Sequence, residues 1–442
     1  MSSQLPANWA IAPLGDLGRW GSGGTPSRNN VDFYRDGTIP WLVIGDLNEG
    51  YVHGAQNQIT EAGLAGSSAK LLAPGTLLVA MYGSIGKTAV TAVPCATNQA
   101  IASCLPHQGV SLRYLHRAVQ WLKPTLIQQG QGGAQQNISQ GILKTQELPL
   151  PPALEQQRIA DKLDTVLARV NAVNDRLARV APLLKRFRQS VLAAATSGRL
   201  TADWREVFPQ GSWQTTEVQH IASVGTGATP LRSNSEFFAE AGTPWVTSAA
   251  TSADVVRQAS EHVTPAAIAA HRLKVYPVGT LLVAMYGEGK TRGQVTELGI
   301  SATINQACAA VVVNETLMVR SFVKLALQAN YLEMRVLAEG GNQPNLNLSK
   351  VKGFSLPRPS LAEQSEIVRR ADLLFAFADR LEARLQAAQT ATSRLTPALL
   401  AKAFRGELVP QDPADEPAAE LLRRLAAERS VPVKKARAKR AS

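Results

Sequence analysis

Two glycine–lysine turns carry the residue types of a phosphate-binding loop. They read GSIGKT at 83–88 and GEGKT at 287–291. A nucleotide-binding loop follows the pattern G-x-x-x-x-G-K-S/T, whose backbone amides wrap the phosphates. Met81 and Ala284 stand where its first glycine belongs, so we expect no nucleotide site. The turns either bring glycine amides and a lysine to DNA phosphates or are ordinary tight turns after a strand.

The two turns belong to a long tandem repeat. GTLLVAMYG at 75–83 recurs unchanged at 279–287, and shorter matches keep the same order on both sides. The shorter matches pair Trp9 with Trp213, Thr25-Pro26 with Thr229-Pro230, Pro40-Trp41 with Pro244-Trp245, Asn98-Gln99-Ala100 with Asn305-Gln306-Ala307, and Glu155-Gln156 with Glu363-Gln364. A period this long indicates a duplicated domain pair rather than a solenoid.

Arginine, asparagine and glutamine are the side chains that read base edges through paired hydrogen bonds. Arg28 and Arg232 follow the Thr-Pro turns, and Arg292 follows the second glycine–lysine turn, where the first copy has Ala89. Such differences between copies are what two different DNA sites would require, although a solvated surface arginine explains each one equally well. The candidate DNA-binding residues are Arg28, Ser84, Lys87, Gln135, Asn137, Arg232, Lys290, Arg292, Gln343 and Asn345.

The amide residues among these candidates have a second interpretation. We expect Gln135, Asn137, Gln343 and Asn345 to order the loop before each helix more than to read bases. Tyr82 and Tyr286 could stack on a sugar or base, but a place in the core or at its rim is favoured. The second loop reads GGNQPNLN where the first reads GGAQQNIS, and Pro344 stiffens it.

Signatures of catalysis and of metal binding are missing from the sequence. The six histidines form no HExxH pattern, and Cys95, Cys104 and Cys308 form no CxxC pair. There is neither a GxSxG elbow nor an NPPF- or DPPY-type adenine-methyltransferase motif. We therefore expect no metal site, no structural disulfide and no catalysis by this chain alone.

In two long segments the apolar residues recur at alternating steps of four and three, which is the heptad pattern of a coiled-coil seam. We expect Pro182 and Pro397 to kink or interrupt the two helices. A parallel pair would oblige the fifteen residues 198–212, which reach about 50 Å, to return along a helix of about 60 Å, so antiparallel packing is predicted. The seam residues are Ile159, Leu163, Val170, Leu177, Leu184, Ile367, Leu374, Leu381, Leu385 and Leu395.

The predicted fold class is α+β. Two tandem-repeated α+β domains are joined by two long helices that pack as an antiparallel coiled coil with pseudo-twofold symmetry. The expected boundaries are a first domain at 1–152, a helical spacer at 153–200, a second domain at 201–360, a second spacer at 361–408, and a docking segment with a basic tail at 409–442.

The charge of the chain favours an anionic partner only locally. The net charge is +12, and its excess lies in the first helical segment and in a tail that includes Lys434, Lys435, Arg437, Lys439 and Arg440. The sequence has neither an apolar run long enough for a membrane span nor a secretory leader at its start. We expect a cytoplasmic protein, which also suits the unpaired cysteines.

Three further segments resemble a known family. QSVLAAATSGRLTADWR at 189–205, LPLPPALEQQRI at 148–159 and GELVPQDPADEPAAELLRRL at 406–425 are similar to Type I restriction–modification specificity subunits. The resemblance covers nearly the whole chain, with both copies present. It implies that each α+β domain is a target-recognition domain that reads one half of a bipartite DNA site.

The resemblance also implies partners. Methyltransferase subunits, two of them expected, would dock on the helices and supply S-adenosylmethionine for adenine methylation. A separate motor–nuclease subunit would use ATP and Mg²⁺ to restrict DNA, and this chain would hold no cofactor. The alternative is a non-catalytic coiled-coil scaffold that binds DNA without sequence preference.

Overall fold

The computed structural model describes residues 5–130, 136–209, 211–286, 291–334 and 346–430. The chain divides into two compact units, Met1–Leu177 with Ala388–Ser442 (unit 1) and Ala178–Ala387 (unit 2). We call residues 10–150 of unit 1 head 1 and residues 214–358 of unit 2 head 2. No helix in the described ranges has the length and apolar character needed to cross a bilayer.

Head 1 is built on a mixed five-stranded sheet in the order β2-β9-β6-β7-β4. Its central strand β6 is the run Leu-Leu-Val-Ala, and it is buried at every position because both faces of the sheet are covered. A turn with Gly75 at φ +81° leads into it, a conformation that favours glycine. The strands are β2 (Gly18–Ser22), β4 (Tyr51–Val52), β6 (Leu77–Ala80), β7 (Thr88–Thr91) and β9 (Ile101–Pro106).

Smaller elements complete head 1. A three-stranded sheet has the order β5-β3-β8, and a two-stranded ribbon pairs β1 with β10 antiparallel. These elements are β1 (Ala10–Pro13), β3 (Ile39–Leu42), β5 (Gln58–Ile59), β8 (Ala96–Thr97), β10 (Glu147–Leu150), α1 (Glu61–Ala65), α2 (Leu112–Gln128) and α3 (Gln140–Lys144).

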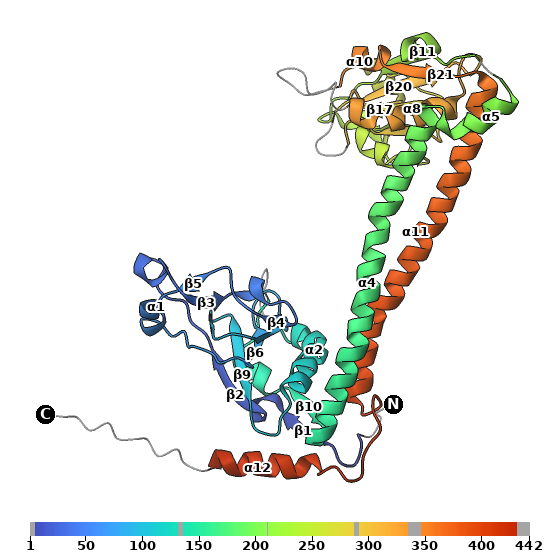
Figure 1. Cartoon of the computed structure of the whole chain (residues 1–442). Coiled ribbons are helices and arrows are strands. Elements are labelled where there is room, and N and C mark those ends of the chain that lie inside the picture. The colour runs from blue at the N-terminus through green and yellow to red at the C-terminus, as the bar shows by residue number, and fades with distance from the viewer. Residues whose placement is uncertain (1–4, 131–135, 210, 287–290, 335–345, 431–442) are drawn as a thin grey trace. The chain divides into compact units, whose positions relative to one another are not determined.

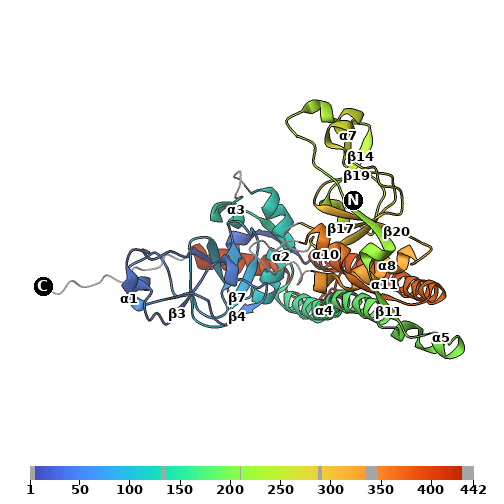
Figure 2. The ribbon, with the colours of Figure 1, turned by 90° about the horizontal axis from the view of Figure 1, so that it is seen from above.

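Head 2 repeats this arrangement. Its five-stranded sheet has the order β12-β20-β17-β18-β15, and Figure 2 shows its smaller sheet, with β14, β19 and α7, set apart from β17 and β20. The elements are β11 (Gln214–Glu217), β12 (Ala222–Thr226), β13 (Phe238–Ala239), β14 (Thr243–Val246), β15 (Val255–Val256), β16 (Glu261–Val263), β17 (Leu281–Ala284), β18 (Val295–Leu298), β19 (Thr303–Ile304), β20 (Cys308–Val313), β21 (Ser355–Arg358), α6 (Val218–Ile221), α7 (Pro265–His271), α8 (Arg320–Ala329) and α10 (Leu348–Lys352). The predicted pair of repeated α+β domains is confirmed.

Two long helices, α4 (Ala153–Thr196) and α11 (Leu361–Phe404), run side by side (Figure 1). In unit 1 the start of α4, with Leu163, shares a core with the end of α11, with Phe404. In unit 2 the end of α4, with Val191, packs with the start of α11, with Ala371. The end of one helix meets the start of the other in each unit, so the predicted antiparallel packing is confirmed.

The prolines do not interrupt these helices, as the sequence had suggested they could. Pro182 lies inside α4 and Pro397 inside α11, and each helix is assigned continuously across its proline. A proline removes one backbone hydrogen bond, and contacts along a helix of this length hold the chain on both sides of the gap.

Nine of the ten predicted seam residues are buried or half-buried, but Leu395 is 44% exposed, so its prediction is wrong. A straight helix drifts relative to a strict heptad, so the apolar stripe moves forward along the sequence. The inward positions in this part of α11 are the half-buried Thr392 and Thr396, followed by the buried Leu400 and Ala403. The stripe therefore leaves Leu395 on the outer side.

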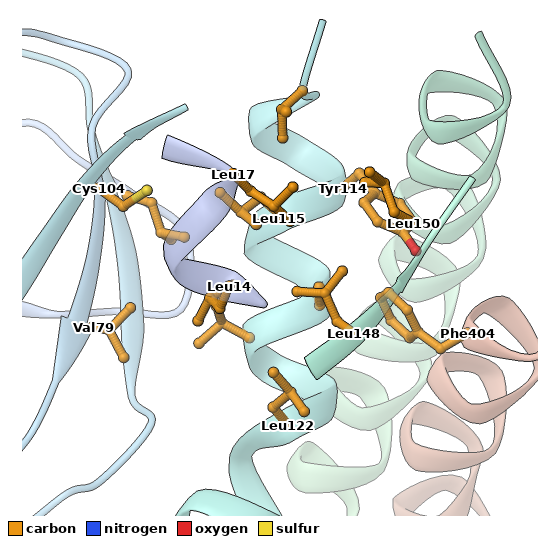
Figure 3. Close-up of a cluster of buried hydrophobic side chains, with 14 of the residues drawn as sticks. Leu14, Leu17, Val79, Cys104, Tyr114, Leu115, Leu122, Leu148, Leu150 and Phe404 are labelled. Atoms are coloured by element: carbon orange, nitrogen blue, oxygen red, sulfur yellow. The ribbon is translucent and has the colours of Figure 1, made fainter. Parts of the chain in front are cut away.

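The core of unit 1 joins its head to its helices through α2 (Figure 3). On α2, Leu115 lies beside Leu17 on the side of the sheet, whereas Tyr114 lies on the side of the helix pair, and Phe404 of α11 stacks on Trp121 at 4.9 Å between ring centroids. The C-terminal helix α12 (Ala418–Ser430) adds Leu421 and Leu425 to the same core. This segment thus docks onto its own head. In unit 2, α5 (Ala202–Val207) follows α4.

Candidate DNA interface

Four segments of head 1 meet at one edge of the five-stranded sheet, where β2 and β6 end and β9 begins. Ser22 at the end of β2 pairs with Ala102, and Ala80 at the end of β6 pairs with Ile101 at the start of β9. The segments that leave these strand ends therefore lie together. We call residues 24–28, 81–87, 98–100 and 136–138 the loop edge of head 1.

Backbone hydrogen bonds tie these loops to one another. Met81 N donates to Ala100 O at 2.8 Å, and Ile138 N donates to Met81 O at 2.9 Å. Gly83 N donates to Gln136 O at 3.1 Å, and Tyr82 forms a β-bridge with Asn137. The loop edge thus brings together two exposed predicted residues, Ser84 and Asn137, and the exposed Arg28 follows Gly24, whose N donates to Thr97 O at 2.9 Å.

The glycine–lysine turn of head 1 is a hairpin turn between β6 and β7. Gly83 and Gly86 have φ of +63° and +74°, which explains both glycines. Its amides bond within the turn, since Gly86 N donates to Ala80 O at 2.9 Å and Lys87 N donates to Ser84 O at 3.0 Å. This geometry differs from a loop whose amides surround a nucleotide phosphate. The Lys87 ammonium donates to Ile44 O at 3.3 Å.

The second turn is three residues longer, and this overturns the predicted match between the copies. Ala284 N donates to Gln294 O as Ala80 N does to Lys87 O, so Gln294 takes the place of Lys87. The partner of Leu282 is Thr296, the counterpart of Ala89. Arg292 therefore corresponds to Ile85 rather than to Ala89. Its Nε is buried and has no hydrogen-bond partner among the described residues.

The other candidates differ in their surroundings. Arg232 is 61% exposed, pairs with Glu261 at 3.1 Å, and lies 5.5 Å from the ring centroids of Phe238 and Trp245. Tyr82 and Tyr286 are 41% and 38% exposed and lie at the rim rather than in the core. Gln135, Lys290, Gln343 and Asn345 fall outside the described residues.

Sequence reasoning missed one pair of groups at the loop edge. The Thr25 hydroxyl donates to Gln99 Oε1 at 2.5 Å, and the Thr229 hydroxyl donates to Gln306 Oε1 in head 2. The four residues lie in segments that match between the copies, so the repeat itself was the available signal. What the sequence could not show is that the Thr-Pro and Asn-Gln-Ala segments touch.

The neighbouring tryptophans hold the Thr-Pro segments in place. Trp41 Nε1 donates to Gly24 O at 3.0 Å, and Trp245 Nε1 donates to Ala228 O at 3.2 Å. The two Pro-Trp pairs that match between the copies therefore fix the position of the threonine that contacts glutamine. The indole does this as a buried donor that needs a partner.

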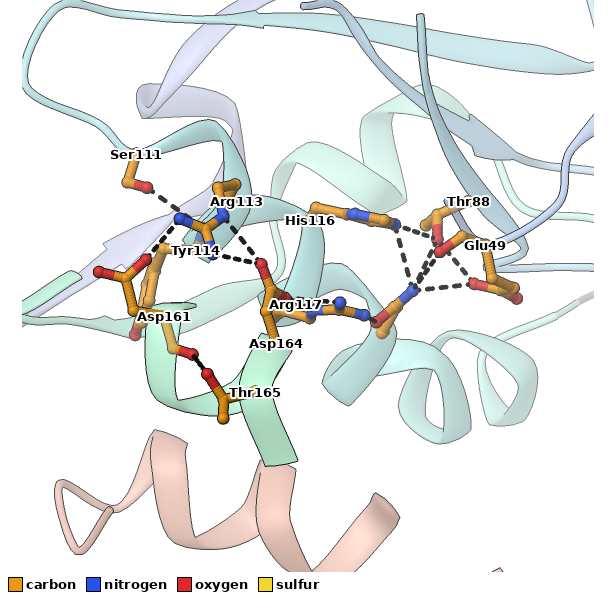
Figure 4. A network of polar contacts seen from close by, with 11 residues as sticks. Glu49, Thr88, Ser111, Arg113, Tyr114, His116, Arg117, Asp161, Asp164 and Thr165 are labelled. Atoms are coloured by element: carbon orange, nitrogen blue, oxygen red, sulfur yellow. Dashed lines mark hydrogen bonds and ion pairs between the residues drawn. The ribbon is translucent and has the colours of Figure 1, made fainter. Parts of the chain in front are cut away.

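A polar network holds Thr88, the residue that follows the glycine–lysine turn of head 1 (Figure 4). The Thr88 hydroxyl donates to Glu49 Oε2 at 2.7 Å and lies 2.9 Å from His116 Nε2. Lys123 pairs with Glu49 at 3.0 Å. Burial, and then the charge of Arg117, lowers the pKa of His116 to about 4, so the ring is neutral at physiological pH.

The same network continues to the long helix. Arg113 and Arg117 on α2 both bind Asp164 on α4, and Arg113 also pairs with Asp161 at 2.6 Å. Burial alone would raise the pKa of Asp164, but hydrogen bonds from Arg117 and Arg113 outweigh it and hold this pKa below the ordinary value. The network therefore fixes the turn, α2 and α4 as one body.

Head 2 replaces the histidine with a lysine. Lys324 on α8 is the counterpart of His116 on α2. It is 9% exposed and pairs with Asp254 at 2.8 Å. Head 2 therefore has no histidine at this position.

We expect unit 1 to lose stability as the pH falls from about 6.5 to about 4, by up to about 3 kcal/mol. The reason is that unfolded His116 takes up a proton in this range, whereas the folded residue takes it up only near pH 4. Hydrogen exchange of α2 and α8, corrected for intrinsic rates, would measure each unit separately. His116→Gln should remove the dependence in unit 1, and an equal loss in both units would contradict the assignment.

A buried carboxylate fixes each head to its helix. Glu155 accepts from Trp9 Nε1 at 3.0 Å and from Gln411 Nε2 at 2.8 Å. Burial raises the pKa of Glu155 despite these hydrogen bonds. Gln156 beside it accepts from Ser111 N at 2.8 Å, at the start of α2.

The joint of head 2 has the same plan with a charged partner. Glu363 accepts from Trp213 Nε1 at 2.9 Å and pairs with Arg205 at 2.6 Å. Gln364 accepts from Val319 N at 2.7 Å, at the start of α8. Both joints therefore place a tryptophan, the residue just before the first strand of each head, against the first turn of a long helix.

Comparisons with known proteins agree with this architecture. Residues 6–180 and 210–388 match the family described as Type I restriction modification DNA specificity domain. The StySPI specificity subunit of Salmonella potsdam is 27% identical over 97% of both chains, and the EcoKI specificity subunit of Escherichia coli K12 is 26% identical over 97% of both.

Solved structures show the same fold. A chain from a study of complex assembly and conformational transition of the type I R-M system has a TM-score of 0.73 at 19% identity, over 91% of this chain and 99% of its own. The HsdS subunit from Thermoanaerobacter tengcongensis has a TM-score of 0.58 at 18% identity, over 92% and 99%. With two repeated heads, two packed long helices and a family match in both halves, this chain belongs to the Type I restriction–modification DNA specificity family.

Proposed function

We propose that this chain is the DNA-reading subunit of a Type I restriction–modification complex and that each head reads one half of a bipartite site. The proposal is supported by two heads that share one arrangement of strands but carry different side chains at the turn. Both heads place a turn between equivalent strands of the sheet, but the second turn is three residues longer, Lys87 is replaced by Gln294, and Ile85 is replaced by Arg292. Different side chains on one framework are what two different half-sites need.

The proposal assigns no chemistry to this chain. Methyltransferase subunits, two of them, would bring S-adenosylmethionine and methylate adenine, and a motor–nuclease subunit would bring ATP and Mg²⁺. Residues 1–152 and 201–360 would be the target-recognition domains, 153–200 and 361–408 the spacers, and 409–442 a docking segment with a basic tail. The candidates Arg28, Ser84, Lys87, Asn137, Arg232 and Arg292 would contact DNA, with Gln135, Lys290, Gln343 and Asn345 proposed from sequence alone.

A binding selection from random duplex DNA tests this function. The chain would be purified with its methyltransferase partner and the bound duplexes sequenced after several rounds. We expect two short conserved blocks separated by a random gap of fixed length. Binding without any motif that fades uniformly with salt would reject sequence reading and favour the scaffold alternative.

A further inference from the structure

We propose that Gln99 and Gln306 bind the sugar–phosphate backbone of DNA, each oriented by a threonine hydroxyl, and that they position the heads without reading sequence. This inference rests on the proposed function, because it needs both heads to meet duplex DNA. It concerns residues that the sequence alone did not single out as candidates.

The orientation of each amide follows from its hydrogen bond. The threonine hydroxyl donates to Oε1, from Thr25 in head 1 and from Thr229 in head 2, which fixes the side-chain carbonyl and turns Nε2 away from it. No described residue accepts a hydrogen bond from either Nε2, and both glutamines are exposed. Each head therefore offers two oriented N–H donors to a ligand that accepts hydrogen bonds, as phosphate oxygens do.

The turn that carries the glutamine is anchored on both sides. Asn98 N donates to Leu42 O at 3.1 Å, and Ala100 N donates to the Asn98 side chain at 3.1 Å. In head 2, Asn305 N donates to Val246 O at 3.0 Å, and Ala307 N donates to the Asn305 side chain at 3.2 Å. The flanking residues thus build the turn, and the exposed glutamine between them is free for another role.

The contrast between the two heads indicates the backbone rather than the bases. The Thr–Gln pair is the same in both heads, whereas the neighbouring glycine–lysine turn differs in length and in side chains. Two different half-sites share phosphates and sugars but not base sequence. A group that both heads keep in one geometry suits the shared part of the ligand, and the variable turn suits the part that differs.

The test uses the full complex with Gln99→Ala, Gln306→Ala and the double variant. The probes are the duplex recovered by selection and a random-sequence duplex of the same length. We expect each single substitution to weaken binding of both duplexes by about tenfold or more, the effect of one hydrogen bond to a charged phosphate, with the double variant near the product. The salt dependence should not change, because a neutral contact releases no counterion.

Matched variants separate this role from a structural one. Thr25→Val should reproduce part of the Gln99→Ala loss and Thr25→Ser should restore binding, since only serine keeps the hydroxyl. Gln219 on α6 is an exposed glutamine whose Nε2 donates to Glu217 Oε2 at 2.6 Å. Because α6 precedes β12 and the Thr229 turn follows that strand, Gln219→Ala should leave binding unchanged.

Three outcomes would overturn the inference or its basis. Unchanged binding by the double variant would show that the glutamines do not contact DNA. A loss confined to the selected duplex would show that they read bases. Equal binding of both duplexes by the unaltered complex would reject sequence reading, while a glutamine effect on both duplexes would still support the backbone contact.

Discussion

We expect Glu363→Gln to destabilise unit 2 by about 3–5 kcal/mol, because it breaks a buried ion pair and leaves its partners in place. Glu363 is fully buried, and it accepts from Trp213, Thr201 and Arg205 at once. The neutral amide loses the pair with Arg205 and presents N–H groups to donors. Denaturant-dependent hydrogen exchange in the core of head 2 would measure the loss.

Glu155→Gln is the matched variant, and we expect it to cost unit 1 only about 1 kcal/mol. Glu155 is equally buried but its direct partners, Trp9 and Gln411, are neutral. Because burial raises the pKa of Glu155, ionising this carboxyl costs more in the folded unit than in the unfolded chain, and a neutral amide relieves that cost. Equal losses in the two units would contradict the different roles of the two carboxylates.

Leu163→Asp should prevent stable folding of unit 1, with an expected loss of about 5 kcal/mol. Leu163 is fully buried where α4 meets α11, so an aspartate there would be removed from water and placed among apolar side chains. Val170→Asp with Leu177→Asp tests the seam nearer the middle of α4, where Leu177 is only half-buried. The resulting loss should appear both in hydrogen exchange of unit 1 and in assembly with the partner.

Ala168→Asp serves as the control for the seam. It introduces the same charge on the exposed side of the same helix, and we expect a change within about 0.5 kcal/mol. If Leu163→Asp were as mild as Ala168→Asp, the antiparallel packing of α4 on α11 in unit 1 would be wrong.

The repeat and the heptads predicted most of the fold because both are periodic signals. The identical GTLLVAMYG segments fall on β6 and β17, at the centre of the two sheets. The direction of the helices followed from the reach of the link between the copies. Leu395 was misplaced because a strict heptad ignores the drift of a straight helix.

The candidate site could be predicted only in part, because long-range contacts decide it. The similar sequences GSIGKT and GEGKT suggest that Lys290 is the counterpart of Lys87. Strand pairing shows instead that Gln294 is the counterpart of Lys87. Trp9 and Glu155 each stood out in the repeat, but their contact across the chain is visible only in the structure. The same holds for Thr25 and Gln99.

The most direct test of the central claim repeats the binding selection with one head altered at a time. Arg28→Ala with Ser84→Ala changes the loop edge of head 1, and Arg232→Ala with Arg292→Ala changes head 2. If each head reads its own half-site, the head 1 variant should lose base preference in one conserved block and keep it in the other. The head 2 variant should show the reverse. Loss of both blocks together in either folded variant, or of neither in both, would contradict a two-headed reader.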